Sequence, residues 1–141
     1  MYPQGNEILI VDHEPKRRER IARLLAAEGF AVTQASEGLT ALRVCANRRY
    51  ALIVAAVDLP GSLDGGATAR RVRLRQPWVR VLYTGEPSSR PAPGNLDIDD
   101  FIAAPFERFE LIGCVFELLH RIAVGEAADL ARSIRAERKA S

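Results

Sequence analysis

Short apolar runs separated by helix-like segments constrain the fold of this chain more than any other feature. Four runs have the length of strands buried on both faces: Ile8–Val11, Leu52–Ala55, Val79–Tyr83 and Phe101–Ala103. A fifth run, Ala31–Ala35, is more polar, which is typical of a strand at the edge of a sheet. These runs predict a sheet whose central strands are covered on both sides.

Apolar residues at helical spacing fill the stretches between and after these runs. Pro15 suits a first helical turn, Gly29 suits a helix stop, and Ser36 suits a helix cap. We expect helices at Pro15–Glu28, Ser36–Asn47, Gly66–Arg75 and Phe109–Val124. Strands that alternate with helices run parallel through right-handed crossovers, which predicts an α/β fold with three layers.

The place for a fourth helix, between Tyr83 and Phe101, breaks this pattern. Residues 84–95 contain three prolines and two glycines. A proline inside a helix costs about 3 kcal/mol and a glycine about 1 kcal/mol. We therefore expect a loop or a single turn, so that the fourth helix is short or absent.

Five motifs, taken together and in order, resemble the receiver domains of response regulators. They are the strand and acidic turn Ile8–Pro15, the first helix Arg17–Phe30, the loop Leu59–Gly65, the strand Val81–Gly85 and the segment Asp100–Phe106. The resemblance covers residues 5–124 and leaves 125–141 as a C-terminal helical extension. It implies a flavodoxin-like three-layer sandwich with a five-stranded parallel sheet in the order 2-1-3-4-5 and a site at the carboxyl ends of the strands.

The resemblance also implies a chemistry. A receiver transfers a phosphoryl group from a histidine kinase to its own aspartate, with Mg²⁺ held by acidic side chains and with a lysine and a hydroxyl on the phosphoryl oxygens. In this chain the acceptor position is Ala56, the second acidic position is His13 and the lysine position is Ala104. Asp12 and Thr84 are the two site groups that remain.

These replacements agree with one another, because a lysine without the neighbouring carboxylates would be a stranded cation. The resemblance therefore predicts a degenerate receiver with no catalytic residue and with Mg²⁺ binding lost or weak. We expect a non-enzymatic domain of two-component signalling, or phosphorelay, that acts by protein–protein contact. Thr84 and Phe101 occupy the switch positions and are interpreted as packing residues, and the bond before Pro105 is expected to be cis.

Two other interpretations stay open at this stage. Asp58, which lies two residues beyond Ala56, could be a relocated phosphoacceptor in a working regulator. Asp12 and His13, beside Glu14, could bind a transition metal or another ligand, because imidazole suits such ions better than Mg²⁺.

Composition limits the partners and the compartment. Lys and Arg total 20 against 18 Asp and Glu, a net charge of +2, so the basic faces of two helices are interpreted as solvated rather than as nucleic-acid or membrane sites. No signal peptide is evident, and no apolar run approaches the ~20 residues of a membrane span. We expect a cytoplasmic protein in which Cys45 and Cys114 are buried free thiols.

The helix predicted at Phe109–Val124 is apolar around most of its circumference, more than packing on one face of a sheet requires. The extension after Gly125 or a second subunit could cover the remainder. The resemblance implies a signalling protein as partner (a histidine kinase, another regulator or an output protein), and the apolar helix allows a homodimer formed through the last helix and the C-terminal tail.

Overall fold

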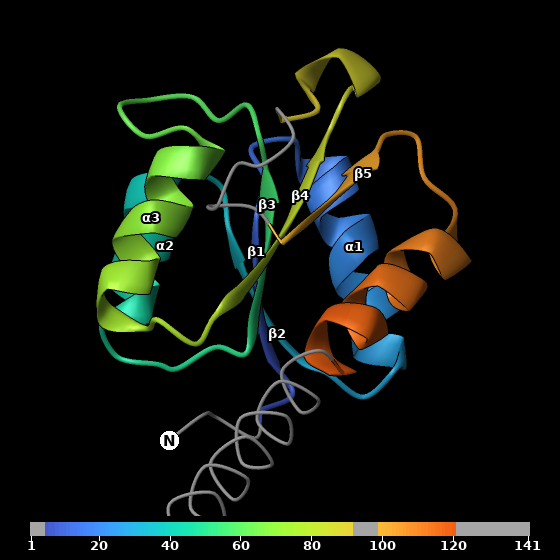
Figure 1. Ribbon diagram of the computed structural model, residues 1–141, viewed down its shortest axis with the longest axis horizontal. Helices are drawn as coiled ribbons and strands as arrows, with labels where there is room; N and C mark the ends of the chain where they lie inside the picture. Colours follow the sequence, from blue (N-terminus) through green and yellow to red (C-terminus); the bar gives the residue numbers. More distant parts are fainter. Residues whose placement is uncertain (1–4, 92–98, 121–141) are drawn as a thin grey trace, which may run out of the picture.

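The sheet has the predicted strand order. A computed structural model describes residues 5–91 and 99–120, in which five parallel strands lie in the order β2-β1-β3-β4-β5 (Figure 1). The strands are β1 (Glu7–Val11), β2 (Ala31–Ala35), β3 (Leu52–Ala56), β4 (Arg80–Gly85) and β5 (Asp100–Ala103). The prediction of a flavodoxin-like fold is confirmed.

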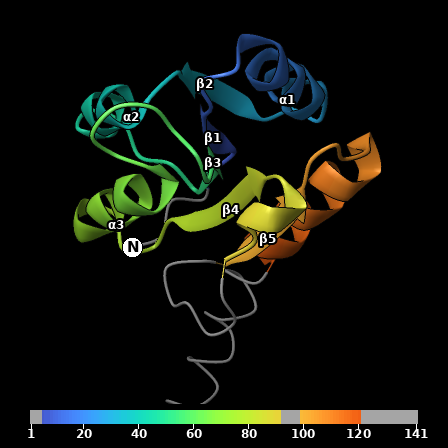
Figure 2. The ribbon, with the colours of Figure 1, turned by 90° about the horizontal axis from the view of Figure 1, so that it is seen from above.

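Helices cover both faces of the sheet, which gives the expected three layers. They are α1 (Pro15–Ala27), α2 (Gly38–Cys45), α3 (Gly65–Arg75) and an unlabelled helix at 108–120. Figures 1 and 2 show α2 and α3 on one face, and α1 with the 108–120 helix on the other. Among the described residues, no helix combines the length and the apolar character needed to cross a bilayer.

The two faces of the sheet carry alternate residues of the same strands, as strand geometry requires. Ile8 and Ile10 of β1 belong to the core under α1, whereas Leu9 and Val11 belong to the core under α2 and α3. All five residues of β3 are buried. Burial on both faces explains why the central strands are continuous apolar runs.

The start of α1 is the one predicted from the sequence, whereas the start of α2 differs from the prediction. Glu14 caps α1 by accepting hydrogen bonds from two backbone amides, and Pro15 is the first residue of that helix. Ser36 does not cap α2, because the helix begins at Gly38 and its cap position is Glu37. Gly38 lies close against α3, because a Cβ there would be 2.3 Å from Thr68 Oγ1.

The described part of the fourth-helix slot contains one short turn, the 3₁₀ helix η1 (Pro87–Ser89). Residues 92–98, and the extension expected at 125–141, lie outside the described residues. Both cysteines are free thiols, as expected. Cys45 is buried but Cys114 is half-buried, because it lies on the flank of the 108–120 helix, and burial raises both thiol pKa values to about 11.

A buried glutamine that the sequence pattern does not reveal joins α3 to the segment before β3. The Gln76 side chain accepts a hydrogen bond from the Tyr50 amide at 3.0 Å and donates to the carbonyls of Cys45 and Arg48 at 3.1 and 2.9 Å. It thereby supplies hydrogen-bond partners for buried backbone groups at or beyond the ends of the helices and strands. Loops rarely pair such groups on their own.

Replacing this side chain is expected to destabilise the domain. Gln76→Ala removes three hydrogen bonds and leaves buried backbone groups unpaired, so the free energy of unfolding should fall by about 2–4 kcal/mol. Urea unfolding followed by circular dichroism measures this. Gln34→Ala, at an exposed position on β2, is the matched control and should change stability by less than about 0.5 kcal/mol. Equal effects of the two substitutions would contradict the role assigned to Gln76.

Candidate functional site

The carboxyl ends of the strands bring the predicted site positions to one edge of the sheet, at the top of Figure 1. Asp12 directly follows β1, and Ala56 is the last residue of β3. The register pairs Ala56 with Thr84 of β4, while Ala104 directly follows β5. The fold therefore gathers the positions that the sequence selects.

Asp12 is the carboxylate at the centre of this edge, and it is 1% exposed. Arg17, from the first turn of α1, holds both of its oxygens. Arg17 Nε donates to Asp12 Oδ2 at 2.5 Å, and Arg17 Nη2 donates to Asp12 Oδ1 at 2.7 Å. This two-pronged geometry is the strongest form of an arginine–carboxylate contact, and it neutralises the buried charge.

The start of α1 is folded around this ion pair. The Glu14 amide donates to Asp12 Oδ1 at 2.9 Å, and Glu14 Oε2 accepts from the Arg17 amide at 2.8 Å. Arg18 Nη1 donates to the Asp12 carbonyl at 2.9 Å. Hydrogen bonding to the Asp12 carboxylate is the main cause that raises the pKa of Arg17 above its ordinary value, so the guanidinium is permanently charged.

The donor set at this edge does not fit Mg²⁺. This ion requires near-octahedral coordination by oxygen atoms, usually from carboxylates and water. Both Asp12 oxygens already accept charge-assisted hydrogen bonds from Arg17, and Ala56 contributes no side-chain oxygen. Within the described residues, no three His, Cys, Asp or Glu side chains converge as metal ligands.

The structure does not bring His13 and Asp58 into the Asp12 pair. His13 is exposed, and its Nδ1 lies 4.0 Å from Asp12 Oδ1, beyond hydrogen-bond distance. Asp58 is also exposed, and its Oδ2 accepts a hydrogen bond from the Ser89 hydroxyl of η1 at 3.2 Å. Among the described residues, no hydrogen bond or ion pair joins Asp58 to Asp12.

The two switch positions are packed. Thr84 and Phe101 are both buried, and the Arg90 guanidinium lies 4.7 Å from the centre of the Phe101 ring. A cation over an aromatic face is attracted by the electron density of the ring. This contact holds the segment after η1 against β5.

The lysine position is at the margin of an open cavity of about 430 Å³. The Ala104–Pro105 bond beside it is cis, the isomer expected from the sequence. Arg20 of α1 extends to this margin, where Nη2 donates to the Phe106 carbonyl at 3.1 Å and the guanidinium lies over the Phe106 ring. The lining residues are Glu14, Lys16, Arg17, Arg20, Glu86, Ala104, Pro105 and Phe106.

Sequence reasoning missed Arg17 as a site residue and interpreted it as one of several solvated cations on the first helix. A usable signal exists: Asp12 follows a buried strand and requires a counter-charge when position 104 holds no lysine. Arg17 is placed on the first turn of the next helix, within reach of that strand end. Predicting the choice of Arg17 over Arg18 requires the orientation of α1 on the sheet.

Similarity to known proteins identifies the family of this chain. The sequence profile of the response regulator receiver domain matches residues 8–116. The chain belongs to this family. Receiver domains are signalling domains that interact with histidine kinases and other signalling proteins.

Relatives of known sequence or structure agree. The transcriptional regulatory protein SrrA of Staphylococcus aureus is 33% identical over 119 residues, 83% of this chain and 49% of SrrA. The crystal structure of NtrX from Brucella abortus is similar with a TM-score of 0.80 at 28% identity, over 88% of this chain and 29% of NtrX. TrrA of Thermotoga maritima, solved with Mg²⁺ and BeF, has a TM-score of 0.72 at 26% identity, over 79% of this chain and 97% of TrrA. The chain thus spans about half the length of SrrA.

Arg17 is expected to be essential for the stability of this receiver. Arg17→Ala leaves a buried carboxylate without its counter-charge, which costs about 3–5 kcal/mol for a fully buried pair. Because Arg17 is one-third exposed, water compensates in part, and we expect a loss of about 2–4 kcal/mol in the free energy of unfolding. Urea unfolding measures it.

Two variants test whether this loss reflects the ion pair. Arg23→Ala removes an exposed cation from the same helix and should change stability by less than about 0.5 kcal/mol. Asp12→Asn combined with Arg17→Ala removes the buried charge as well and should recover part of the loss. A double variant that is less stable than Arg17→Ala alone would contradict the electrostatic account.

Proposed function

We propose that this receiver is not phosphorylated and acts in two-component signalling by protein–protein contact. The observation that carries the proposal is the Arg17 guanidinium on both oxygens of Asp12. In a phosphorylatable receiver that carboxylate would help to hold Mg²⁺. Here the Arg17 guanidinium, a permanent cation, binds the carboxylate in place of the metal.

The residues at the other site positions support the same proposal. Ala56 ends β3 where the acceptor aspartate is expected, and its methyl group has no oxygen that could attack phosphorus. Ala104 replaces the lysine that would stabilise the phosphoryl oxygens. With the acceptor, the lysine and the second acidic position replaced together, and with Asp12 held by Arg17, the site is suited to a fixed conformation rather than to a phosphorylation cycle.

Mass spectrometry with a small phosphodonor tests this proposal. The chain is incubated with acetyl phosphate and Mg²⁺, and we expect its intact mass to stay unchanged while a phosphorylatable receiver treated in parallel gains one phosphoryl group of about 80 Da. A stable adduct on the wild-type chain would contradict the proposal. Loss of that adduct in Asp58→Asn would establish the relocated acceptor instead.

Restoring the site should show that Arg17 competes with the metal. A triple variant carries His13→Asp, Ala56→Asp and Ala104→Lys with Arg17 retained, and a quadruple variant adds Arg17→Ala. We expect acetyl phosphate and Mg²⁺ to label the quadruple variant faster by on the order of tenfold, which corresponds to ~1.4 kcal/mol of competition for Asp12. Time courses of intact mass give both rates.

Circular dichroism verifies that both restored variants are folded before their rates are compared. Equal labelling rates would show that Arg17 does not compete with the metal. If neither folded variant is labelled, the assignment of these three positions to a receiver site is wrong.

A further inference from the structure

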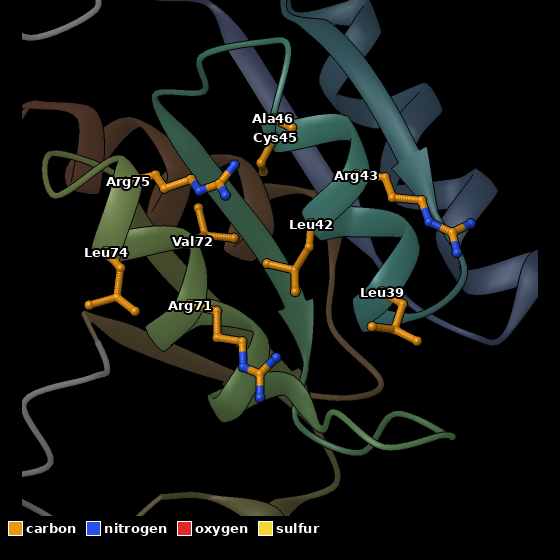
Figure 3. A pocket seen from close by; sticks show the side chains of 9 residues that line it. All are labelled: Leu39, Leu42, Arg43, Cys45, Ala46, Arg71, Val72, Leu74 and Arg75. Carbon is orange, nitrogen blue, oxygen red and sulfur yellow. The ribbon is translucent and has the colours of Figure 1, made fainter.

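A hollow of the described surface lies away from the Asp12 edge, between α2 and α3. It has a volume of about 610 Å³, and Figure 3 shows its lining side chains. They are Leu39, Leu42, Arg43, Cys45 and Ala46 from α2 and the segment after it, and Arg71, Val72, Leu74 and Arg75 from α3. We call this hollow the α2–α3 groove.

The contact between the two helices explains why a groove exists. At their amino ends the helices touch, because Gly38 packs against Thr68 with no space for a Cβ atom. The lining residues all follow this contact along their helices. Helices that close at one end leave a groove where they diverge, and α2, with eight residues, gives it a wall of about 12 Å.

The floor and walls of the groove are apolar and incompletely covered. Leu42 and Val72 face each other between the helices in Figure 3. Leu39 is 45% exposed and Leu74 is 84% exposed, which makes them two of the four large apolar side chains exposed in the described part of the chain. Apolar side chains gathered at a hollow, rather than scattered singly, mark a surface that binds something.

The rim of the groove is cationic. Arg71 and Arg75 extend from α3 toward α2 in Figure 3, and Arg43 is the third arginine of the lining. Neither helix contains an acidic residue. Within the described part of the chain, these three exposed arginines form no ion pair with a carboxylate.

The cationic surface continues beyond the end of α2. A second hollow of about 480 Å³ adjoins the groove and shares Cys45, Ala46 and Arg75 with it. Arg48 and Arg49 line this continuation, and the Arg49 guanidinium lies over the Trp78 ring. A bound partner that extends beyond the groove would therefore meet further positive charge rather than negative charge.

We propose that the α2–α3 groove binds an amphipathic helix of a partner protein, with leucine-like side chains on the apolar floor and Asp or Glu along its flanks. Charge complementarity carries this choice: acidic flanks would neutralise Arg43, Arg71 and Arg75, and an apolar stripe would cover Leu39 and Leu74. The inference rests on the proposed function and specifies it, because it names the surface and the chemistry of the contact.

Other occupants match the groove less well. A nucleic-acid backbone would pair with the arginines but would leave the leucine floor without an apolar partner. The tail of this chain, residues 126–141, contains three acidic and four basic residues, so its charge does not complement the rim. A lipid surface could accept both leucine and arginine side chains, and it is included in the test as a separate arm.

Selection of peptides on the full chain tests the proposal. A displayed library of helical peptides of about 16 residues, four turns or more, is randomised on one face and its flanks. We expect the selected peptides to carry Leu, Ile, Met or Phe at i, i+3 or i+4 and i+7, with Asp or Glu beside them. Their synthetic forms should bind more weakly as salt is added.

Variants locate the binding. Leu74→Gln, and Arg71→Glu combined with Arg75→Glu, change exposed side chains and should each weaken peptide binding about tenfold or more. Arg23→Glu, an exposed arginine on α1 at the opposite face, should change it by less than about twofold. Circular dichroism and urea unfolding confirm that all variants keep their fold.

Several outcomes would overturn the proposal. They are no enrichment over the bare support, enriched peptides that are basic or lack the apolar stripe, and binding that the groove variants leave unchanged. Binding to phosphatidylserine vesicles that is lost in the same variants, without peptide binding, would assign the groove to a membrane instead.

The phosphodonor measurement distinguishes a failure of the groove proposal from a failure of the proposed unphosphorylated state. A phosphoryl adduct together with peptide binding in the groove would refute the unphosphorylated state and keep the partner surface. An unchanged mass together with no peptide binding would refute the groove and keep the unphosphorylated state.

Discussion

A carboxylate buried at the end of a central strand has to be neutralised, and the way Asp12 is neutralised determines the rest of this site. Removing a lone charge from water costs several kcal/mol, so the fold is stable only with a cation or a metal against it. Arg17 supplies that cation from the first turn of α1 with two hydrogen bonds. The same turn is capped by Glu14, whose own amide donates to Asp12, so the ion pair and the helix start stabilise each other.

This arrangement explains why the other site positions are compatible with residues other than Asp and Lys. Ala56 and Ala104 lie at the same edge of the sheet as Asp12, and His13 follows Asp12 in the chain. Arg17 already balances the charge of Asp12, and a lysine at position 104, which lines the same cavity as Arg17, would be repelled by it. An additional aspartate at position 56, on a fully buried strand, would lack a counter-charge of its own. The three replacements and Arg17 are therefore one consistent electrostatic solution.

Much of the fold follows from local pattern, and the site follows only in part. The strands and the short turn in the described part of the fourth helical slot were predictable because each depends on residues close together in the sequence. The order of the strands was implied by the resemblance to receiver domains, since no local pattern specifies which strands pair. The start of α2 at Gly38 instead of a cap at Ser36 was not predictable, since local patterns leave helix ends uncertain by one or two residues. The same holds for Gln76, whose partners Cys45, Arg48 and Tyr50 are distant in the chain. Arg17 is an intermediate case: the sequence shows that Asp12 needs a cation, but it does not show which residue supplies that cation.

The end of β3 at Ala56 and the α2–α3 groove are connected through α3. The Gly65 amide, at the start of α3, donates to the Val57 carbonyl at 3.0 Å, and a Cβ on Gly65 would lie 2.2 Å from the Ala56 carbonyl oxygen. The helix that forms one wall of the groove therefore begins in tight contact with the end of β3. In a receiver that is phosphorylated, this end of the strand gains charge and its surroundings readjust. With Ala56 there and Arg17 closing the Asp12 site, the proposed absence of phosphorylation leaves no such charge to move α3. Under this proposal the groove keeps one shape whatever the kinase activity, which favours a partner that binds irrespective of that activity.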